Sequence, residues 1–316
     1  MAAAPQSPGG DVSVMDPRVG DMPLTYDWPY DEPFLGLLAQ ALRAVGRSHV
    51  TVNPQSVADT FERLQRGDFT ARAFLDRAVD TDLAFEPLEA WAEAHVPLLL
   101  NPAADRRRVW KKSNVRWEFI RAGLHTPHTI VIPAWSRQPV RDPLSDLDPL
   151  GATFAIKPDL GGGGGWGVTL GARSWARVEQ TRRDMPDDAL LLQELVEPEL
   201  VDGRRAWFRV FYARGTVVPC WWDDRTRRFG EWIDADARRR WNLDALWDVI
   251  QVASGIARLQ VFSTEVARLV DGRWIVVDYV NDPIDLHLKS HAREGMPVEV
   301  ADHLAEAIAR FVAQQA

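Results

Sequence analysis

The sequence predicts a mixed α/β (α+β) protein, and three observations lead to this fold class. Helical and strand-like patterns alternate over residues 23–101, which is typical of an α/β unit. Five consecutive glycines follow an apolar strand-like segment near the middle of the chain. Pairs of strand-like segments joined by turn signals lie in the last third. A chain of 316 residues is long enough for about two domains.

Composition excludes several classes of protein. Hydrophobic residues make up 46% and charged residues 26%, which allows a sizeable core and excludes disorder for most of the chain. A net charge of −8, with no basic run longer than three arginines, argues against nucleic-acid binding. No apolar run approaches the ~18 residues that a membrane helix needs. The first ten residues lack the pattern of a secretory signal, and the single cysteine favours a reducing, cytoplasmic location.

The first third of the chain predicts a tail followed by an α/β unit. Residues 1–22 are rich in Pro, Gly and Ala without periodicity, which predicts a flexible tail. Helices are predicted where apolar residues recur at helical spacing: 31–45, 56–65 and 87–95. Strands are predicted from β-branched or buried apolar runs: 49–53 and 96–101.

The remainder predicts a longer series of elements. Residues 105–122 predict one long helix that ends before a glycine. Strands are predicted at 129–132, 153–157, 189–193, 206–213, 216–222, 261–270 and 273–280. The last two strands form a hairpin across Asp271-Gly272. Further helices are predicted at 243–259 and 298–312.

A lysine and a run of glycines follow one of these strands. Lys157 ends the apolar strand, and residues 161–165 are all glycine. Glycine has no Cβ and reaches positive φ, so successive backbone amides can point at an anion. The spacing is neither that of a P-loop nor that of a dinucleotide fingerprint. Because apolar strands flank the run closely, a phosphate-covering loop is favoured over a flexible linker.

Lysine is rare in this chain, and its few positions are therefore informative. Only four of the 37 basic residues are lysines: Lys111, Lys112, Lys157 and Lys289. A GC-rich coding sequence explains the excess of arginine but not where the lysines lie. An ammonium is a compact charge that reaches a single phosphate oxygen, so the lysines are candidate site residues.

Two acidic residues are predicted to lie side by side on the late hairpin. Glu265 and Asp278 lie on either side of the turn and belong to neighbouring strands. Magnesium binds through one or two carboxylates together with substrate phosphates. A carboxylate inside an apolar strand is unfavourable unless it is paired or metal-bound, so a metal site is favoured over two solvent-facing edge residues.

Together these motifs resemble the ATP-grasp superfamily, which includes D-alanine–D-alanine ligase, glutathione synthetase and glutamate-adding ligases. The resemblance covers about residues 101–295 and implies two subdomains that grip ATP, residues 102–195 and 196–316, after a pre-ATP-grasp α/β domain at residues 23–101. It implies an ATP-dependent carboxylate–amine ligase that forms an acyl phosphate on an amino acid, a peptide or a similar small acid. The implied cofactors are ATP and two Mg²⁺, and the implied partners are small-molecule carboxylate and amine substrates. Many relatives are dimers, so a homodimer is one option.

The resemblance also implies roles for individual residues. The nucleotide-binding candidates are Lys112, Lys157, Gly162, Gly163, Gly164, Gly165, Gln193, Glu194 and Val196, with main-chain groups of Glu194 and Val196 as adenine partners. The magnesium-ligand candidates are Glu265, Asp278 and Asn281. The catalytic candidates are Arg209, facing the γ-phosphate, and Lys289, in a loop where similar enzymes hold substrate.

The sequence departs from the family pattern at two places. The family's last strand usually reads acid-x-Asn, whereas Asp278 and Asn281 are three residues apart and would point oppositely on a straight strand. A bulge, a position of Asn281 beyond the strand end, or replacement by Asp282 would each resolve this. Ser263 stands where several relatives carry an arginine, for which Arg209 is the candidate substitute.

Other interpretations stay open at this point. A kinase on the same scaffold would transfer phosphate to a hydroxyl group, and a nucleotide-binding protein without turnover would tolerate the unusual Asp278–Asn281 interval. The aromatic and arginine-rich segment 221–232 would line an acceptor pocket for an acidic or aromatic substrate, or would supply core packing and solvated surface.

Overall fold

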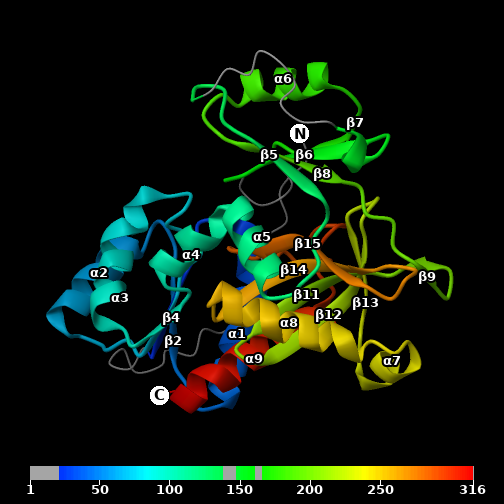
Figure 1. The fold of residues 1–316 in the computed structure, drawn as a ribbon. Helices are drawn as coiled ribbons and strands as arrows, with labels where there is room; N and C mark the ends of the chain where they lie inside the picture. Colours follow the sequence, from blue (N-terminus) through cyan, green and yellow to red (C-terminus); the bar gives the residue numbers. More distant parts are fainter. Residues whose placement is uncertain (1–20, 138–146, 161–165, 316) are drawn as a thin grey trace, which may run out of the picture.

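The computed structural model describes residues 21–137, 147–160 and 166–315, and these residues form three main β-sheets with helices packed against them (Figure 1). Most of the predicted tail and the whole predicted glycine loop, residues 161–165, lie outside the described residues. Met22 is buried in the first strand, so the predicted tail extends too far at its C-terminal end.

The first sheet is parallel and has the strand order β2-β1-β3-β4. Its strands are β1 (Met22–Thr25), β2 (His49–Val52), β3 (Ala73–Leu75) and β4 (Leu98–Leu100). The connecting helices and 3-10 turns are η1 (Pro29–Asp31), α1 (Glu32–Ala44), α2 (Val57–Arg66), η2 (Leu83–Phe85) and α3 (Glu86–His95). The sequence did not indicate β1 or β3, because strands of four and three residues carry too little periodicity.

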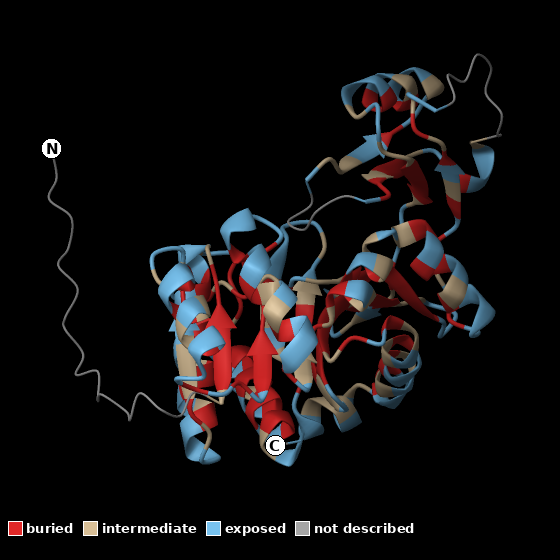
Figure 2. Cartoon of the chain, turned by 90° about the vertical axis from the view of Figure 1, so that its left-hand side faces the viewer, coloured by how far each residue is buried: buried red, intermediate tan, exposed pale blue. Residues whose placement is uncertain are grey.

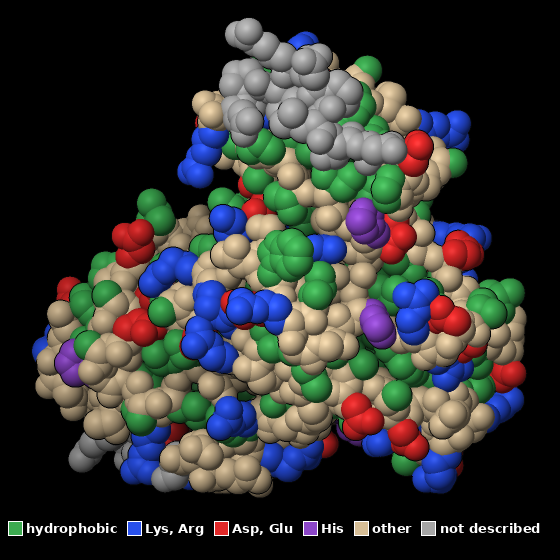
Figure 3. Space-filling model, viewed as in Figure 1, with side chains coloured by type: hydrophobic (Ala, Val, Ile, Leu, Met, Phe, Trp, Pro, Cys, Tyr) green, Lys and Arg blue, Asp and Glu red, His purple; other side chains and the backbone are tan. Residues whose placement is uncertain are grey.

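The second sheet is antiparallel and forms an upper lobe that stands apart from the rest of the molecule (Figures 1 and 3). Its order is β5-β8-β6-β7. The elements of this lobe are β5 (Thr129–Ile132), η3 (Asp148–Leu150), β6 (Phe154–Pro158), β7 (Thr169–Ala172), α6 (Trp175–Asp184) and β8 (Leu190–Glu194). A small core of its own, formed by residues such as Phe154, Ile156, Val178 and Leu192, holds the lobe together.

The third sheet is antiparallel and has the order β13-β12-β11-β14-β15. Its strands are β11 (Trp207–Ala213), β12 (Thr216–Asp223), β13 (Arg228–Trp232), β14 (Val261–Arg268) and β15 (Trp274–Asn281). A two-stranded ribbon, two helices and the last helix accompany it: β9 (Leu200–Val201), β10 (Arg204–Arg205), α7 (Ala235–Arg240), α8 (Asp244–Ala257) and α9 (Val298–Gln315). The expected late hairpin is the pair β14–β15.

The two faces of the third sheet are covered by different helices. Helix α8 packs its buried residues, such as Leu246 and Ile250, on one face. Helices α9 and α1 share a core with the other face, which joins the first sheet to the third. Buried residues gather in the interior of the lower body, and a smaller group of them lies in the upper lobe (Figure 2). Within the described ranges, no helix is both long enough and apolar enough to cross a membrane.

The single helix predicted at residues 105–122 is wrong, because the structure divides it into α4 (Ala103–Trp110) and α5 (Lys112–Arg121). Lys111 between them has an extended backbone, with ψ of 91°. The carboxylate of Asp159 accepts hydrogen bonds from the Ser113 backbone N–H at 2.7 Å and from its hydroxyl at 2.8 Å. This tertiary cap satisfies an N–H group of the first turn of α5 and makes the break stable.

Candidate functional site

A cleft with a volume of about 710 Å³ lies between the upper lobe and the third sheet. Strands β6 and β8 line it from above, and β11, β14 and β15 line it from below. It brings together the sequence-predicted residues Lys112, Lys157, Gln193, Glu194, Val196, Arg209, Glu265, Asp278 and Asn281. The predicted residues Gly162, Gly163, Gly164 and Gly165 lie outside the described residues. Lys289 does not line this cleft and instead lines a second cavity beside it.

Glu265 and Asp278 are direct partners across the β14–β15 ladder, as the turn between their strands predicted. The register of this ladder shifts between Glu265 and the next pair of Ser263 with Asn281. Tyr279 and Val280, the two residues of the shift, are both buried in the core formed with helix α8. A β-bulge therefore turns two consecutive side chains to one face and places Asp278 and Asn281 together on the cleft face.

Asp282 does not replace Asn281 in the cleft. Its Oδ1 accepts a hydrogen bond of 2.8 Å from the side chain of Asn101, and the residue is not part of the cleft lining. Burial raises the pKa of the Asp282 carboxyl to about 6. The sequence left three explanations open for the interval between Asp278 and Asn281, and the structure shows the β-bulge.

Arg209 stands beside the first acid. Its Nη1 donates to Glu265 Oε1 at 2.8 Å, and its Nη2 donates to Ser263 Oγ at 3.0 Å. Its Nε is buried and has no hydrogen-bond partner within the part of the chain that the structure describes. An arginine from the neighbouring strand β11 therefore lies beside position 263.

The charged groups of the cleft influence one another strongly. Burial lowers the pKa of the Lys157 ammonium, while Asp278 and Glu265 act in the opposite direction. Burial raises the pKa of the Glu265 carboxyl, which Asp278 reinforces and Arg209 opposes. Burial would also raise the pKa of Asp278, but the charges of Lys112 and Lys157 outweigh it and hold that pKa below its ordinary value. Two neighbouring carboxylates of this kind favour the entry of a cation.

The donor set of the cleft fits magnesium. Glu265, Asp278 and Asn281 offer only hard oxygen donors from side chains. Within the described residues, no group of three or more His, Cys, Asp and Glu side chains could hold a metal ion, which excludes a zinc-type cluster there. Magnesium commonly uses one or two protein carboxylates and completes its shell with water and phosphate oxygens, so this smaller set is sufficient.

The end of β8 connects the two halves of the cleft. Gln193 Nε2 donates to the Val277 carbonyl at 3.4 Å and contacts the Tyr279 hydroxyl at 3.2 Å. The Glu194 backbone N–H donates to the carbonyl of His128, and the Glu194 side chain accepts from the His128 N–H at 2.7 Å. Because that N–H of Glu194 is already used, an adenine ring would be recognised by the remaining main-chain groups of residues 194–196.

Sequence reasoning missed two residues that hold the site in place. Trp207 Nε1 donates to Glu265 Oε2 at 3.0 Å and orients the carboxylate. Asp159 caps α5 and thereby places Lys112 at the cleft. Trp207 and Arg209 are two residues apart on one strand and therefore share a face, so the sequence could have indicated that Trp207 lies beside Arg209 at the site. Asp159 gave no such signal, because its partner lies 46 residues away.

The arrangement of sheets and helices described above is also found in solved structures. The chain superposes on the ATP-grasp ligase PsnB complexed with precursor peptide PsnA2 and AMPPNP, with a TM-score of 0.60, 15% identity, and coverage of 96% of this chain and 99% of that chain. A RimK domain ATP-grasp protein from Sphaerobacter thermophilus gives a TM-score of 0.60 at 19% identity, covering 92% and 99%. D-alanine–D-alanine ligase from Bacillus anthracis complexed with ATP gives 0.59 at 12% identity, covering 95% and 96%.

No family model matches the sequence, and no curated protein matches it. The structural likeness extends over nearly the whole chain at low identity, and such a likeness defines the fold. The protein has the ATP-grasp fold, which confirms the predicted fold class and the resemblance at the level of the fold.

Proposed function

We propose that this protein is an ATP-dependent carboxylate–amine ligase that acts through an acyl phosphate. The observation that carries the proposal is the shared cleft, which Lys157 of β6 and Lys112 at the start of α5 line together with Glu265, Asp278 and Asn281. Lysines beside a hard-oxygen donor set are what a triphosphate with bound magnesium requires.

The residues of the cleft would do their work by binding and positioning. Lys112 and Lys157 bind phosphate oxygens as point charges, and the guanidinium of Arg209, which also lines the cleft, adds positive charge beside the transferred group. Glu265, Asp278 and Asn281 hold magnesium, which when bound neutralises charge on the phosphates. Phosphoryl transfer relies on positioning and on neutralised charge rather than on a covalent protein nucleophile.

The chemical balance of the proposed reaction is simple. A carboxylate oxygen of the donor substrate bonds to the γ-phosphorus, and the bond to the bridging oxygen breaks, which releases ADP. The amine of the acceptor then attacks the carbonyl carbon and displaces inorganic phosphate, which takes up the proton that the amine loses as the amide forms. The PsnB structure contains a precursor peptide, which supports testing peptides beside amino acids as substrates. A homodimer and a cytoplasmic location stay predictions.

The bulge weakens the case for a nucleotide-binding protein without turnover, since that interpretation rested on the unusual Asp278–Asn281 interval. A screen for ADP release with amino acids and peptides, in the presence of magnesium, tests the proposal directly. Hydroxylamine added to an active mixture should yield a hydroxamate from the acyl phosphate. A stable phosphoester instead of a hydroxamate would identify a kinase and overturn the ligase assignment.

A further inference from the structure

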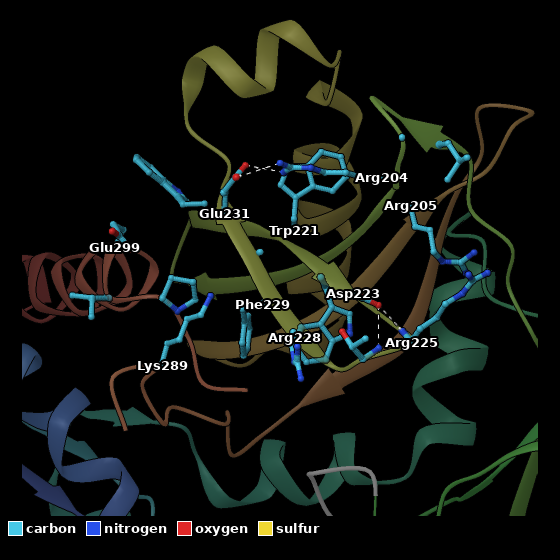
Figure 4. Close-up of a pocket in the computed structure, with 18 of the residues that line it drawn as sticks. Arg204, Arg205, Trp221, Asp223, Arg225, Arg228, Phe229, Glu231, Lys289 and Glu299 are labelled. Carbon is cyan, nitrogen blue, oxygen red and sulfur yellow. Dashed lines mark hydrogen bonds and ion pairs between the residues drawn. The ribbon is translucent and has the colours of Figure 1, made fainter. Parts of the chain in front are cut away.

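A second cavity, larger than the nucleotide cleft, surrounds an unpaired edge of the third sheet. Its volume is about 1230 Å³, and all five residues of the edge strand β13, Arg228–Trp232, line it. Figure 4 shows β13 in its centre, with Lys289 and Glu299 to one side and Arg204 and Arg205 to the other. A cavity of this size exceeds what a single amino acid needs.

The edge of β13 is open to a further strand. Strand β13 pairs with β12 on one side, and within the described residues no strand pairs with its other side. The cavity reaches both faces of the sheet edge. Trp221 belongs to the core beside α8 and Phe229 to the core beside α9, and both residues line the cavity. An exposed strand edge offers a row of backbone donors and acceptors to an extended peptide.

The charges of the cavity favour an acidic occupant. Arg228 and Lys289 are exposed, and the described residues provide neither with a side-chain partner. Arg225 has one ion pair at 3.7 Å, with Glu197. The lining also holds three acids: Glu231 pairs with Arg204 at 2.7 Å, Asp223 accepts hydrogen bonds from backbone N–H groups of its turn at 2.9 and 3.0 Å, and Glu299 is exposed. Five basic residues against these three acids leave an excess of positive charge in the lining.

The cavity leads into the nucleotide cleft. Arg205, Trp222, Arg225 and Phe229 line both. Arg205 donates to Asp224 at 2.8 and 3.0 Å, which fixes the wall between the two spaces. A chain docked along β13 can therefore extend over this wall toward Arg209 and the acids.

We propose that β13 accepts an acidic polypeptide segment as an added sixth strand, and that this segment docks the substrate whose reactive group enters the cleft. The link to a substrate rests on the proposed function, whereas docking itself does not. Side chains of an added strand alternate, so acids on one face would meet Arg228 and Lys289 while apolar residues on the other would meet Phe229 and Trp232.

Fluorescence anisotropy with a labelled decapeptide of alternating Glu and Val tests the docking on the full chain. The same peptide with alternate backbone amides N-methylated keeps its charge but loses two or three hydrogen bonds, so its affinity should fall about 10–100-fold. Raising salt from about 0.05 to about 0.5 M should weaken the parent peptide. Equal binding of both peptides, or no binding at about 1 mM, overturns the proposal.

Variants locate the docking site. Arg228→Glu and Lys289→Glu should each weaken the peptide several-fold, and together about tenfold or more. Arg173→Glu, an exposed arginine on the upper lobe, is the matched control and should bind as the parent does. Unchanged affinity in the double variant overturns the assignment to β13.

A second titration separates this proposal from the proposed function. Arg228 does not line the nucleotide cleft, so Arg228→Glu should bind an ATP analogue with magnesium normally. Lys157→Ala should lose the nucleotide and keep the peptide. Peptide docking without nucleotide binding in the parent protein would contradict the ligase assignment and leave docking standing.

Discussion

Two clusters of charged residues in this protein resemble each other in composition and differ in how their charges are satisfied. At the carboxyl ends of the parallel strands, Arg106 is only 3% exposed and donates to Asp76 at 2.5 Å. Asp76 also accepts hydrogen bonds from the Thr25 hydroxyl and from two backbone N–H groups. Its carboxylate is thereby fully engaged by the protein itself.

The cleft between the upper lobe and the third sheet has a similar mixture of cations and acids, but its lysine is weakly paired and two of its acids face each other. Within the described residues, Lys157 Nζ donates one long hydrogen bond, to the Val277 carbonyl at 3.5 Å. Glu265 and Asp278 oppose each other directly. Arg209 and Arg106 each have a buried Nε without a partner among the described residues, so this feature does not distinguish the two clusters. The comparison teaches that buried charge alone does not mark a site. A weakly paired buried lysine and two facing carboxylates that line one cavity make the stronger candidate for a site.

Removing Arg106 should produce the largest effect on stability. Arg106→Met leaves Asp76 and Glu89 without their cation, and a broken buried pair typically lowers the free energy of unfolding by about 3–5 kcal/mol. Urea unfolding followed by circular dichroism measures the change. Arg107→Met, at the exposed neighbouring position, should stay within about 0.5 kcal/mol. Equal midpoints for the two variants would contradict a structural role for the cluster.

Removing a cleft charge should affect activity rather than folding. Lys157→Ala and Asp278→Ala should each lower turnover by about 10²–10³, the scale of a lost charge-stabilising donor. The Lys157→Ala variant should unfold at the same urea concentration as the parent or higher, because burial disfavours the ammonium. Lys111→Ala, at an exposed lysine, is the control. Full ADP release in both cleft variants would show that the cleft is not the active site.

The β-bulge places Asn281 in the cleft, and this position leads to a prediction about the magnesium requirement of the reaction. Asn281→Ala should raise the magnesium concentration needed for half-maximal ADP release by about tenfold, as expected for a lost group at a metal site. Asp282→Asn should leave it unchanged, since Asp282 is held by Asn101 outside the cleft. A larger shift for Asp282→Asn than for Asn281→Ala would reverse the assignment of these two neighbours.

The smallest effect is expected at Ser263. Ser263→Ala removes one hydrogen bond to Arg209, which contributes about 0.5–1.5 kcal/mol, so turnover should fall about two- to tenfold. Arg209→Ala should cost considerably more, because it removes the cation beside Glu265. If Ser263→Ala were as inactive as Arg209→Ala, the serine would have a role of its own.

Much of the fold was predictable because the informative patterns are local. Alternating apolar residues and the Asp271-Gly272 turn predicted the hairpin that pairs Glu265 with Asp278. The position of Lys157 near the end of its strand could likewise be predicted from neighbouring residues. Strands β1 and β3 were not predicted, since each is short and depends on distant partners. The edge strand β13 was not predicted either, although its partner β12 directly precedes it.

The sequence by itself determined which residue types were available and in what order, because strand alternation and turn chemistry act over a few residues. Only the tertiary structure decided where these side chains meet. Asp159 divides the predicted long helix from 46 residues away, and the packing of Tyr279 and Val280 against α8 turns Asn281 into the cleft. The position of Lys289 beside β13 was settled in the same way. Such outcomes depend on contacts between distant segments, which no local pattern encodes.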